Sequence, residues 1–149
     1  MVAALVGALN DEDAVIRMRA ADALEKVSRS HADLVCRFAP LLLRLAANSG
    51  QQEVRWHLAQ MMPRLQLSAK QRACCVHTLT AYLEDRSSIV RTCALQALAE
   101  LAVIDRRLRR TVNVMLLEAR QHGSPAMRAR AKRILAMSPM KRGDRCRRR

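Results

Sequence analysis

Cysteine and histidine, the side chains that most readily bind metals, come together in the segment Cys74-Cys75-Val76-His77 of the 149-residue chain. Adjacent residues of a helix point about 100° apart, so Cys74 and Cys75 cannot easily hold one ion. No second Cys/His pair stands at ligand spacing elsewhere in the sequence. We therefore expect no metal site, with Cys75 in the core and Cys74 partly exposed.

The sequence lacks the short motifs that carry common enzyme chemistry. It contains no His-Glu-x-x-His pair, no glycine-rich phosphate loop and no nucleophile elbow. Its carboxylates fall mainly in predicted turns and on exposed helix faces, where solvation is the usual state. We predict a protein without catalytic residues, without a cofactor and without enzymatic activity.

One polar stripe stands apart because it contains the only tryptophan, Trp56, together with His57, Gln60 and Arg64. A large aromatic side chain on a polar helix face is typical of an anchor for a partner. The alternative is that Trp56 packs sideways against the neighbouring repeat. We interpret His57 as a surface histidine, with a catalytic or ligand role as the alternative.

The elements that position these residues are predicted to be helices. Half of the residues are hydrophobic, only 2% are aromatic, and glycine and proline occur four times each. Alanine and leucine dominate and favour helix, while the residues that favour strands are few. No uncharged run approaches the roughly 20 residues that span a bilayer, so no transmembrane segment is expected. The five cysteines are an odd number, and no secretory signal precedes them, which predicts reduced thiols in the cytoplasm.

A hydrophobic residue followed by arginine recurs at intervals of 38, 36 and 37 residues. The four arginines are Arg17, Arg55, Arg91 and Arg128, and a leucine stands twelve residues before each of them. Offsets −1, +3, +6, +7 and +10 from the arginine lie on one face of an α-helix and are apolar, with Ser138 as the exception. Each unit is therefore predicted to be a helix, a polar turn and a second helix, in units of about 1–29, 30–67, 68–104 and 105–137.

Turn residues predict where several helices begin and end. Asp11 and Asp13 suit the start of the second helix of the first unit. In residues 123–125 a glycine can end one helix, a serine can cap the next and a proline can occupy its first position. Pro40 and Pro63 interrupt helical stretches, so each should kink its helix or mark a boundary.

Residues 9–24, LNDEDAVIRMRAADAL, resemble a HEAT repeat, of the short bacterial class also seen in phycobilisome-lyase-like proteins. The resemblance covers about residues 1–137. It implies an all-α fold: one domain built as a right-handed α-solenoid of about four antiparallel helix pairs. It also implies that the repeated arginine pairs with an acidic turn residue of a neighbouring repeat. Asp11, Asp13 and Asp85 stand at matching positions, and the second and fourth units lack such an acid.

In stacked helix pairs the second helices line the concave face, which is the usual binding surface. Offsets +1, +2, +5 and +9 from each repeated arginine should face this groove. These offsets select one set in each unit: Met18, Arg19, Asp22 and Lys26; Trp56, His57, Gln60 and Arg64; Thr92, Cys93, Gln96 and Glu100; and Ala129, Arg130, Arg133 and Met137. We predict a non-enzymatic scaffold whose protein partner is bound by Arg19, Trp56, His57, Gln60, Arg64 and Gln96.

Two kinds of HEAT-like enzyme are alternatives to the scaffold. Bilin lyases attach chromophores to cysteine, but no segment of this chain matches such an active region. HEAT-like DNA glycosylases combine a basic, aromatic-lined groove with an acidic catalytic residue. Here the groove has one tryptophan, and Gln60 stands where an acid would be needed.

The net charge of +14 is concentrated at the C-terminal end. Residues 105–149 hold 15 basic and 3 acidic residues, whereas the first 104 residues carry a net charge of only +2. Such asymmetry predicts an acidic partner, nucleic acid or a membrane surface. The alternative is that 23 arginines against 4 lysines reflect genomic base composition. The nucleic-acid hypothesis assigns phosphate contacts to Arg128, Arg130, Arg133, Arg145, Arg147 and Arg148. We expect residues 138–149 to form a basic, disordered tail.

Overall fold

The computed structural model describes residues 1–137, and within that range it contains helices and no strand. The prediction of an all-α chain is confirmed over this range. The predicted basic tail, 138–149, lies outside the described residues. The helices are α1 Val2–Ala8, α2 Ala14–Ser30, α3 Ala32–Cys36, α4 Ala39–Asn48, α5 Gln52–Met61, α6 Ala69–Tyr82, α7 Ser88–Ile104, α8 Arg109–His122 and α9 Pro125–Met137, with short 3₁₀ turns η1 Met62–Arg64 and η2 Arg106–Leu108.

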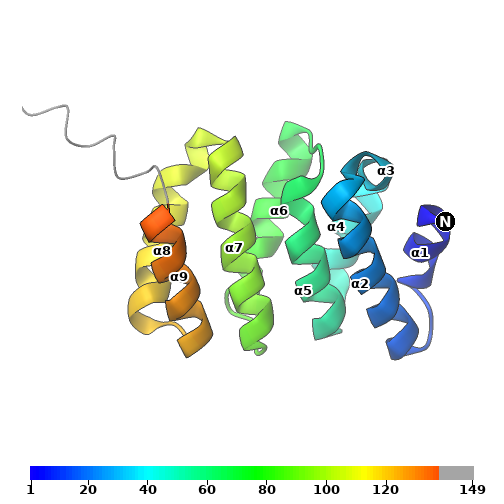
Figure 1. Ribbon diagram of the computed structural model, residues 1–149, viewed down its shortest axis with the longest axis horizontal. Coiled ribbons are helices and arrows are strands. Elements are labelled where there is room, and N and C mark those ends of the chain that lie inside the picture. The colour runs from blue at the N-terminus through cyan, green and yellow to red at the C-terminus, as the bar shows by residue number, and fades with distance from the viewer. Residues whose placement is uncertain (138–149) are drawn as a thin grey trace, which may run out of the picture.

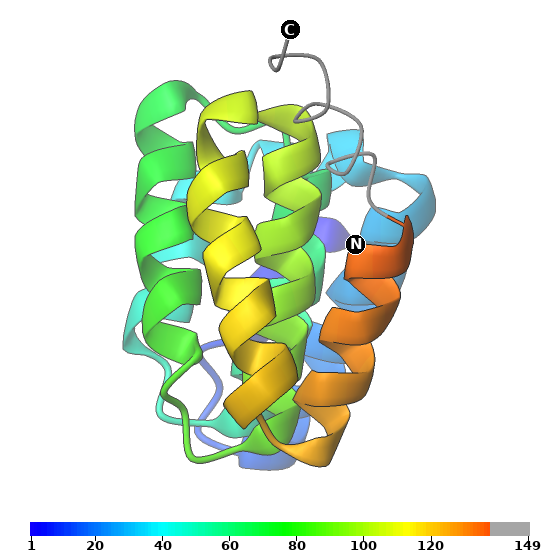
Figure 2. The same ribbon diagram turned by 90° about the vertical axis from the view of Figure 1, so that its left-hand side faces the viewer.

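The helices form two layers, seen from two sides in Figures 1 and 2. In the front layer, α2, α5, α7 and α9 stack side by side, and each contacts the next. Behind them lie α1, α4, α6 and α8, each packed against the front-layer helix that follows it in the chain. This is a helical-repeat arrangement. The right-handed sense of the stack and its division into four units remain predictions.

Side-chain caps set several of the helix ends that the sequence predicts. Asp13 accepts a hydrogen bond from the backbone N–H of Val15 at 2.7 Å and so begins α2. Ser124 likewise accepts from the backbone N–H of Met127 and begins α9 with a proline at its first position. The two proline interruptions are also confirmed as boundaries, because Pro40 lies in the first turn of α4 and Pro63 lies in η1, just after α5 ends.

Gly123 joins α8 to α9 and is required by the close approach of the two helices. A Cβ at this position would lie 2.4 Å from the backbone oxygen of Ala119 and 2.8 Å from Cβ of Met127. The backbone φ at Gly123 is −70°, so the residue is needed for space and not for a left-handed conformation.

The repeated apolar columns form the core. Three residues after each repeated arginine stand Ala20, Leu58, Ala94 and Ala131, all of them at most 3% exposed. The column that precedes the arginine is buried in three units, but Ile16 is 43% exposed, so the prediction that it lies in the core is wrong. Ile16 lies in the first turn of α2, and in the described residues α2 is preceded only by the seven-residue α1. An end helix lacks the neighbour that covers the same column elsewhere.

The repeated arginines join successive turns. Nε of Arg55 lies 2.8 Å from a carboxylate oxygen of Asp85 in the next turn along the stack, as the HEAT resemblance implies. Arg17 reaches forward in the same way, but it donates to the side-chain oxygen of Gln51 because no acid stands there. Arg91 has a buried Nε without a hydrogen-bond partner among residues 1–137. The expected ladder is therefore incomplete in the way that the turn sequences predict.

Candidate functional site

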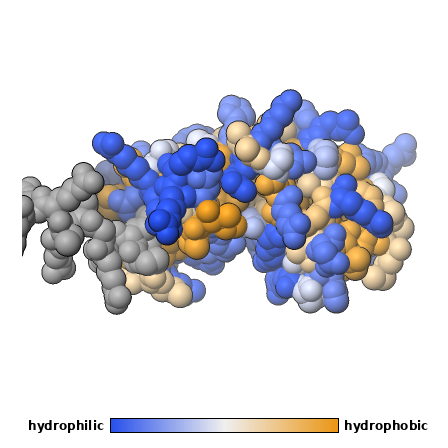
Figure 3. All heavy atoms as spheres, turned by 90° about the horizontal axis from the view of Figure 1, so that it is seen from above, coloured by the Kyte–Doolittle hydropathy of each residue, from blue (hydrophilic) through white to orange (hydrophobic). Residues whose placement is uncertain are grey.

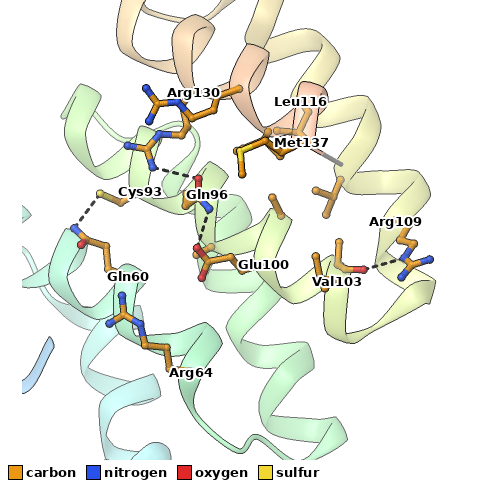
Figure 4. A pocket seen from close by; sticks show the side chains of 16 residues that line it. Gln60, Arg64, Cys93, Gln96, Glu100, Val103, Arg109, Leu116, Arg130 and Met137 are labelled. Atoms are coloured by element: carbon orange, nitrogen blue, oxygen red, sulfur yellow. Dashed lines mark hydrogen bonds between the residues drawn. The ribbon is translucent and has the colours of Figure 1, made fainter. Parts of the chain in front are cut away.

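A pocket of about 540 Å³ lies between α7 and α9, with α8 behind it (Figure 4). We call it the α7–α9 pocket. Its volume falls within the range of about 300–1,000 Å³ that is usual for ligand sites. Its lining comes from α5, η1, α7, α8 and α9. The lining residues are Gln60, Arg64, Cys93, Gln96, Ala97, Ala99, Glu100, Ala102, Val103, Arg109, Val112, Leu116, Arg130, Arg133, Ile134 and Met137.

The deeper part of the pocket is apolar and buried. On the side of α7 it is formed by Ala97 and Ala102, which are at most 2% exposed, and on the side of α8 by Val112 and Leu116, which are equally buried. The alanines are short, so α7 leaves space in front of α8 that a larger side chain would fill. These residues form a closed apolar floor beneath the pocket.

A chain of polar side chains crosses the mouth of the pocket from α9 to α7. Arg130 donates to the side-chain oxygen of Gln96 at 3.2 Å, and the amide nitrogen of Gln96 donates to a carboxylate oxygen of Glu100 at 2.8 Å. On the α5 side, the amide nitrogen of Gln60 contacts Sγ of Cys93 at 3.3 Å. Three successive front-layer helices thus contribute fixed polar groups to one rim.

Arg64 also lines the pocket, but its guanidinium group is held from behind. Nη1 donates to Glu25 Oε1 at 2.7 Å and to the hydroxyl of Ser28 at 2.9 Å. Glu25 is only 1% exposed and also pairs with Arg29 at 2.8 Å. Burial alone raises the pKa of Glu25, yet the hydrogen bonds from Arg29 and Arg64 outweigh it and lower that pKa below its ordinary value. Arg64 therefore links η1 to α2 as well as lining the site.

Three further arginines line the pocket, and none of them has an acidic partner in the described residues. Arg109 donates to the backbone carbonyl of Ala102, Arg130 donates to Gln96, and Arg133 is exposed. Within residues 1–137, no ion pair joins any of the three to an acidic side chain. Glu100 is the single carboxylate of the lining. The rim is therefore strongly cationic.

The pocket includes several predicted groove residues and leaves others out. Gln60, Arg64 and Gln96 line it, as do Arg130 and Arg133, which were assigned to phosphate contacts. Three other groove positions selected by the repeat offsets, Cys93, Glu100 and Met137, line it as well. Five more of these positions do not line it: Met18, Asp22, Lys26, Thr92 and Ala129.

Trp56 and His57 lie outside the α7–α9 pocket. Trp56 is half-buried and packs against the core, with its ring centroid 5.7 Å from that of His57. Nδ1 of His57 is buried without a hydrogen-bond partner in the described part of the chain. Burial lowers the pKa of His57, and the charges of Asp22 and Glu25 only partly oppose this effect. A neutral ring is therefore favoured at this position.

The remaining predicted contacts are dispersed. Arg19 is exposed on α2, and Arg128 donates to the backbone carbonyl of Gly123. Neither residue lines the pocket. Arg145, Arg147 and Arg148 lie outside the described residues.

Sequence reasoning missed the α8 wall of the site, which includes Arg109, Val112 and Leu116, and the exposed Val103 at the end of α7. The groove prediction took positions from second helices only, whereas the space between α7 and α9 reaches back to the first helix of the unit. One signal was present, because Val103 and Ile104 extend the apolar run of α7 beyond its periodic positions. Both are more than half exposed. Figure 3, a view from above, shows apolar surface (orange) among hydrophilic side chains (blue).

The cysteines are placed as predicted where the structure describes them. Cys75 is fully buried and Cys74 is exposed. Burial raises the pKa of Cys75 to about 12 and also raises that of Cys93, despite a hydrogen bond from Gln60. Both thiols are therefore protonated near neutral pH, and a protonated thiol is a poor nucleophile. Among residues 1–137, no group of three or more metal-ligating side chains lies close enough to hold an ion.

Comparison with solved structures places this fold among helical-repeat proteins. Two engineered proteins superpose with TM-scores of 0.68 and 0.66 at 20% and 19% identity. Each alignment covers 91% of this chain but only 61% and 62% of the engineered protein, so the chain spans about three-fifths of their length. The structure of the complex of CpcE and CpcF of phycocyanin lyase from Nostoc sp. PCC7120 also matches, with a TM-score of 0.62 and 18% identity over 90% of this chain and 97% of that one.

These likenesses establish the fold alone, because all three identities are at or below 20%. No family model and no curated protein matches the sequence. The CpcE/CpcF fold is HEAT-like, which agrees with the repeat pattern, and membership of the HEAT family remains a prediction. In the described residues, no helix combines the length and hydrophobicity that crossing a bilayer requires.

Proposed function

We propose that this protein is a non-enzymatic helical-repeat scaffold of the cytoplasm that binds a protein partner through the front layer of α2, α5, α7 and α9. The observation that carries the proposal is the α7–α9 pocket. It gathers Gln60, Gln96 and Arg130 from three successive front-layer helices at one rim, above an apolar floor. Protein-binding sites commonly combine an apolar centre with a polar, hydrated rim in this way.

The chemistry of the pocket supports binding more than catalysis. Its one thiol, Cys93, has a raised pKa, and its one carboxylate, Glu100, accepts a hydrogen bond from Gln96. A retaining or inverting glycoside hydrolase commonly uses two carboxyl groups, and covalent attachment through a thiol needs a thiolate. One neighbour is described as phycocyanin lyase, but the lining offers neither a thiolate nor a pair of carboxyl groups, and we propose neither lyase nor glycosylase activity. CpcE and CpcF occur as a complex, which is consistent with a partner-binding role for this fold.

Comparative capture of binding proteins tests this function. Wild-type protein and the variants Gln96→Ala and Trp56→Ala would be immobilised in equal amounts and exposed to lysate of the source cells. Exposed Arg120 on α8 lies outside the pocket, so Arg120→Ala is the control. We expect Gln96→Ala to lose at least one protein that the control retains. Capture of identical proteins at identical levels by all variants would contradict the proposal.

Phosphate binding is the alternative function, and it rests on the basic C-terminal end. Counterion release predicts that affinity for duplex DNA falls steeply with salt. A fluorescence titration at low and moderate salt, with the full chain and with Arg145→Gln/Arg147→Gln/Arg148→Gln, would test it. Salt-dependent binding that the triple variant loses favours this alternative. Absence of binding, or binding that is indifferent to salt, removes it.

A further inference from the structure

The mouth of the α7–α9 pocket has a charge imbalance that its own residues do not neutralise. Arg109, Arg130 and Arg133 line the pocket together with a single carboxylate, that of Glu100, and none of the three arginines forms an ion pair within residues 1–137. Arg130 and Arg133 stand three residues apart on α9, so their charges repel one another, and an anion bound beside them relieves an unfavourable interaction. Guanidinium groups also offer paired donors that match the geometry of a carboxylate.

Exposed apolar side chains flank the same mouth. Val103 at the end of α7 is 66% exposed and Met137 at the end of α9 is 78% exposed, while the floor behind them is closed by buried Leu116. Figure 4 shows Leu116 and Met137 on one side of the space, with Gln60 and Arg64 across it. An occupant that spans the mouth would remove both exposed groups from water and place an apolar group on the floor.

The pocket also continues beyond a single helix pair. Gln60 and Arg64 belong to α5 and η1, and they line the edge farthest from α8. The site is therefore open toward the rest of the front layer, so an extended chain could enter on one side and leave on the other. This shape suits a segment of polypeptide better than a small molecule enclosed on all sides.

From these features, and resting on the proposed function, we propose that the α7–α9 pocket binds an acidic segment of a partner protein by inserting one bulky apolar side chain. The apolar side chain lies above the closed floor formed by Ala102, Val112 and Leu116, beside exposed Val103 and Met137. Carboxylates on either side of it contact Arg130 and Arg133. The neutral amides of Gln60 and Gln96 contact the peptide backbone.

Synthetic peptides test this directly with the full-length protein. The first is a short fluorescein-labelled peptide of aspartate, glutamate and serine around a central leucine. The second replaces that leucine by alanine, and the third replaces the acids by their amides. Fluorescence anisotropy should show binding of the first peptide. The alanine peptide should bind about 10-fold more weakly, because the buried apolar group is lost. The amide peptide should bind at least about 3-fold more weakly than the first peptide, because its carboxylates are absent.

Protein variants locate the binding. Arg130→Gln/Arg133→Gln should lower the affinity for the first peptide about 3- to 30-fold, as expected when one or two guanidinium–carboxylate contacts are lost at an open rim. The matched control is Arg110→Gln/Arg120→Gln, which removes the same charge from exposed positions on α8 outside the lining and should bind normally. A second pocket variant, Val103→Glu, adds a negative charge at a residue that is mostly exposed, so folding is preserved while binding is weakened.

The outcomes separate this inference from the proposed function. If the pocket variants and the α8 control lost affinity for the first peptide equally, the binding would be non-specific charge attraction and the inference would be overturned. Equal binding of the leucine and alanine peptides would also overturn it, as would competition by duplex DNA or by decanoate equal to that of unlabelled peptide. If the peptides fail while Gln96→Ala still abolishes partner capture, only the acidic-segment inference is wrong. If both fail, the proposed function is wrong.

Discussion

Loss of Arg64 should destabilise the fold because it leaves a buried carboxylate with one partner fewer. Glu25 has 1% of its side chain exposed, and its partners Arg64 and Arg29 are 30% and 60% exposed. Breaking a buried pair costs about 3–5 kcal/mol when the remaining charge is left uncompensated. Here Arg29 stays in place at 2.8 Å. We therefore expect Arg64→Met to lower the free energy of unfolding by about 1–3 kcal/mol.

Urea unfolding followed by circular dichroism measures this change, and Arg44→Met is the matched control. Arg44 is exposed on α4 and forms no ion pair in residues 1–137, so its replacement should change stability by less than about 0.5 kcal/mol. A double-mutant cycle with Glu25→Gln should give a coupling of about 1 kcal/mol or more. Additive effects, or a loss for Arg64→Met no greater than for the control, would refute the reasoning.

Two further predictions concern a turn and the acid dependence of stability. Gly123→Ala should lower the free energy of unfolding by about 1–3 kcal/mol, because its Cβ would lie 2.4 Å from a backbone oxygen, whereas Gly50→Ala, with no atom within 4 Å, should be neutral or slightly stabilising. Thermal unfolding of the two variants checks this, and equal melting temperatures would contradict it. Arg107 and Arg72 hold the pKa of Asp105 below its ordinary value of 3.8, so the stability that the ionised carboxylate contributes is present above the unfolded pKa and is lost as the pH falls through the lowered folded pKa. Asp105→Asn should therefore lower the free energy of unfolding at neutral pH. It should also reduce the further loss of that free energy as the pH is lowered. If the free energy of unfolding of the variant fell with pH in parallel with that of the wild type, this contribution of ionised Asp105 would be excluded.

Much of the fold can be predicted from the sequence, because each helical repeat is specified by residues that lie near one another along the chain. The spacing of the arginines, the apolar columns and the caps at Asp13 and Ser124 are local patterns, and each is found in the structure. The same reasoning failed at Ile16, because periodicity assigns a residue to a face and cannot say whether a neighbouring helix covers that face at the end of a stack.

The candidate site was only partly predictable for a related reason. The repeat offsets selected Gln60, Gln96 and Arg130 correctly as residues of one surface. They could not reveal that residues of α8 close the floor of the space between α7 and α9. The shape of that space depends on the size of residues such as Ala97 and Ala102 and on how three helices pack, which the period of one helix does not specify.

Site-specific photo-crosslinking tests the central claim, that a protein partner binds at the front layer, most directly. A photoreactive amino acid would replace Gln96 in the pocket and, separately, Glu118, an exposed residue of α8 outside it. After illumination in the source cells, we expect the Gln96 position to form a covalent adduct with a defined protein and the Glu118 position to form none with it. The same adduct at both positions, or no adduct at Gln96, would contradict the claim.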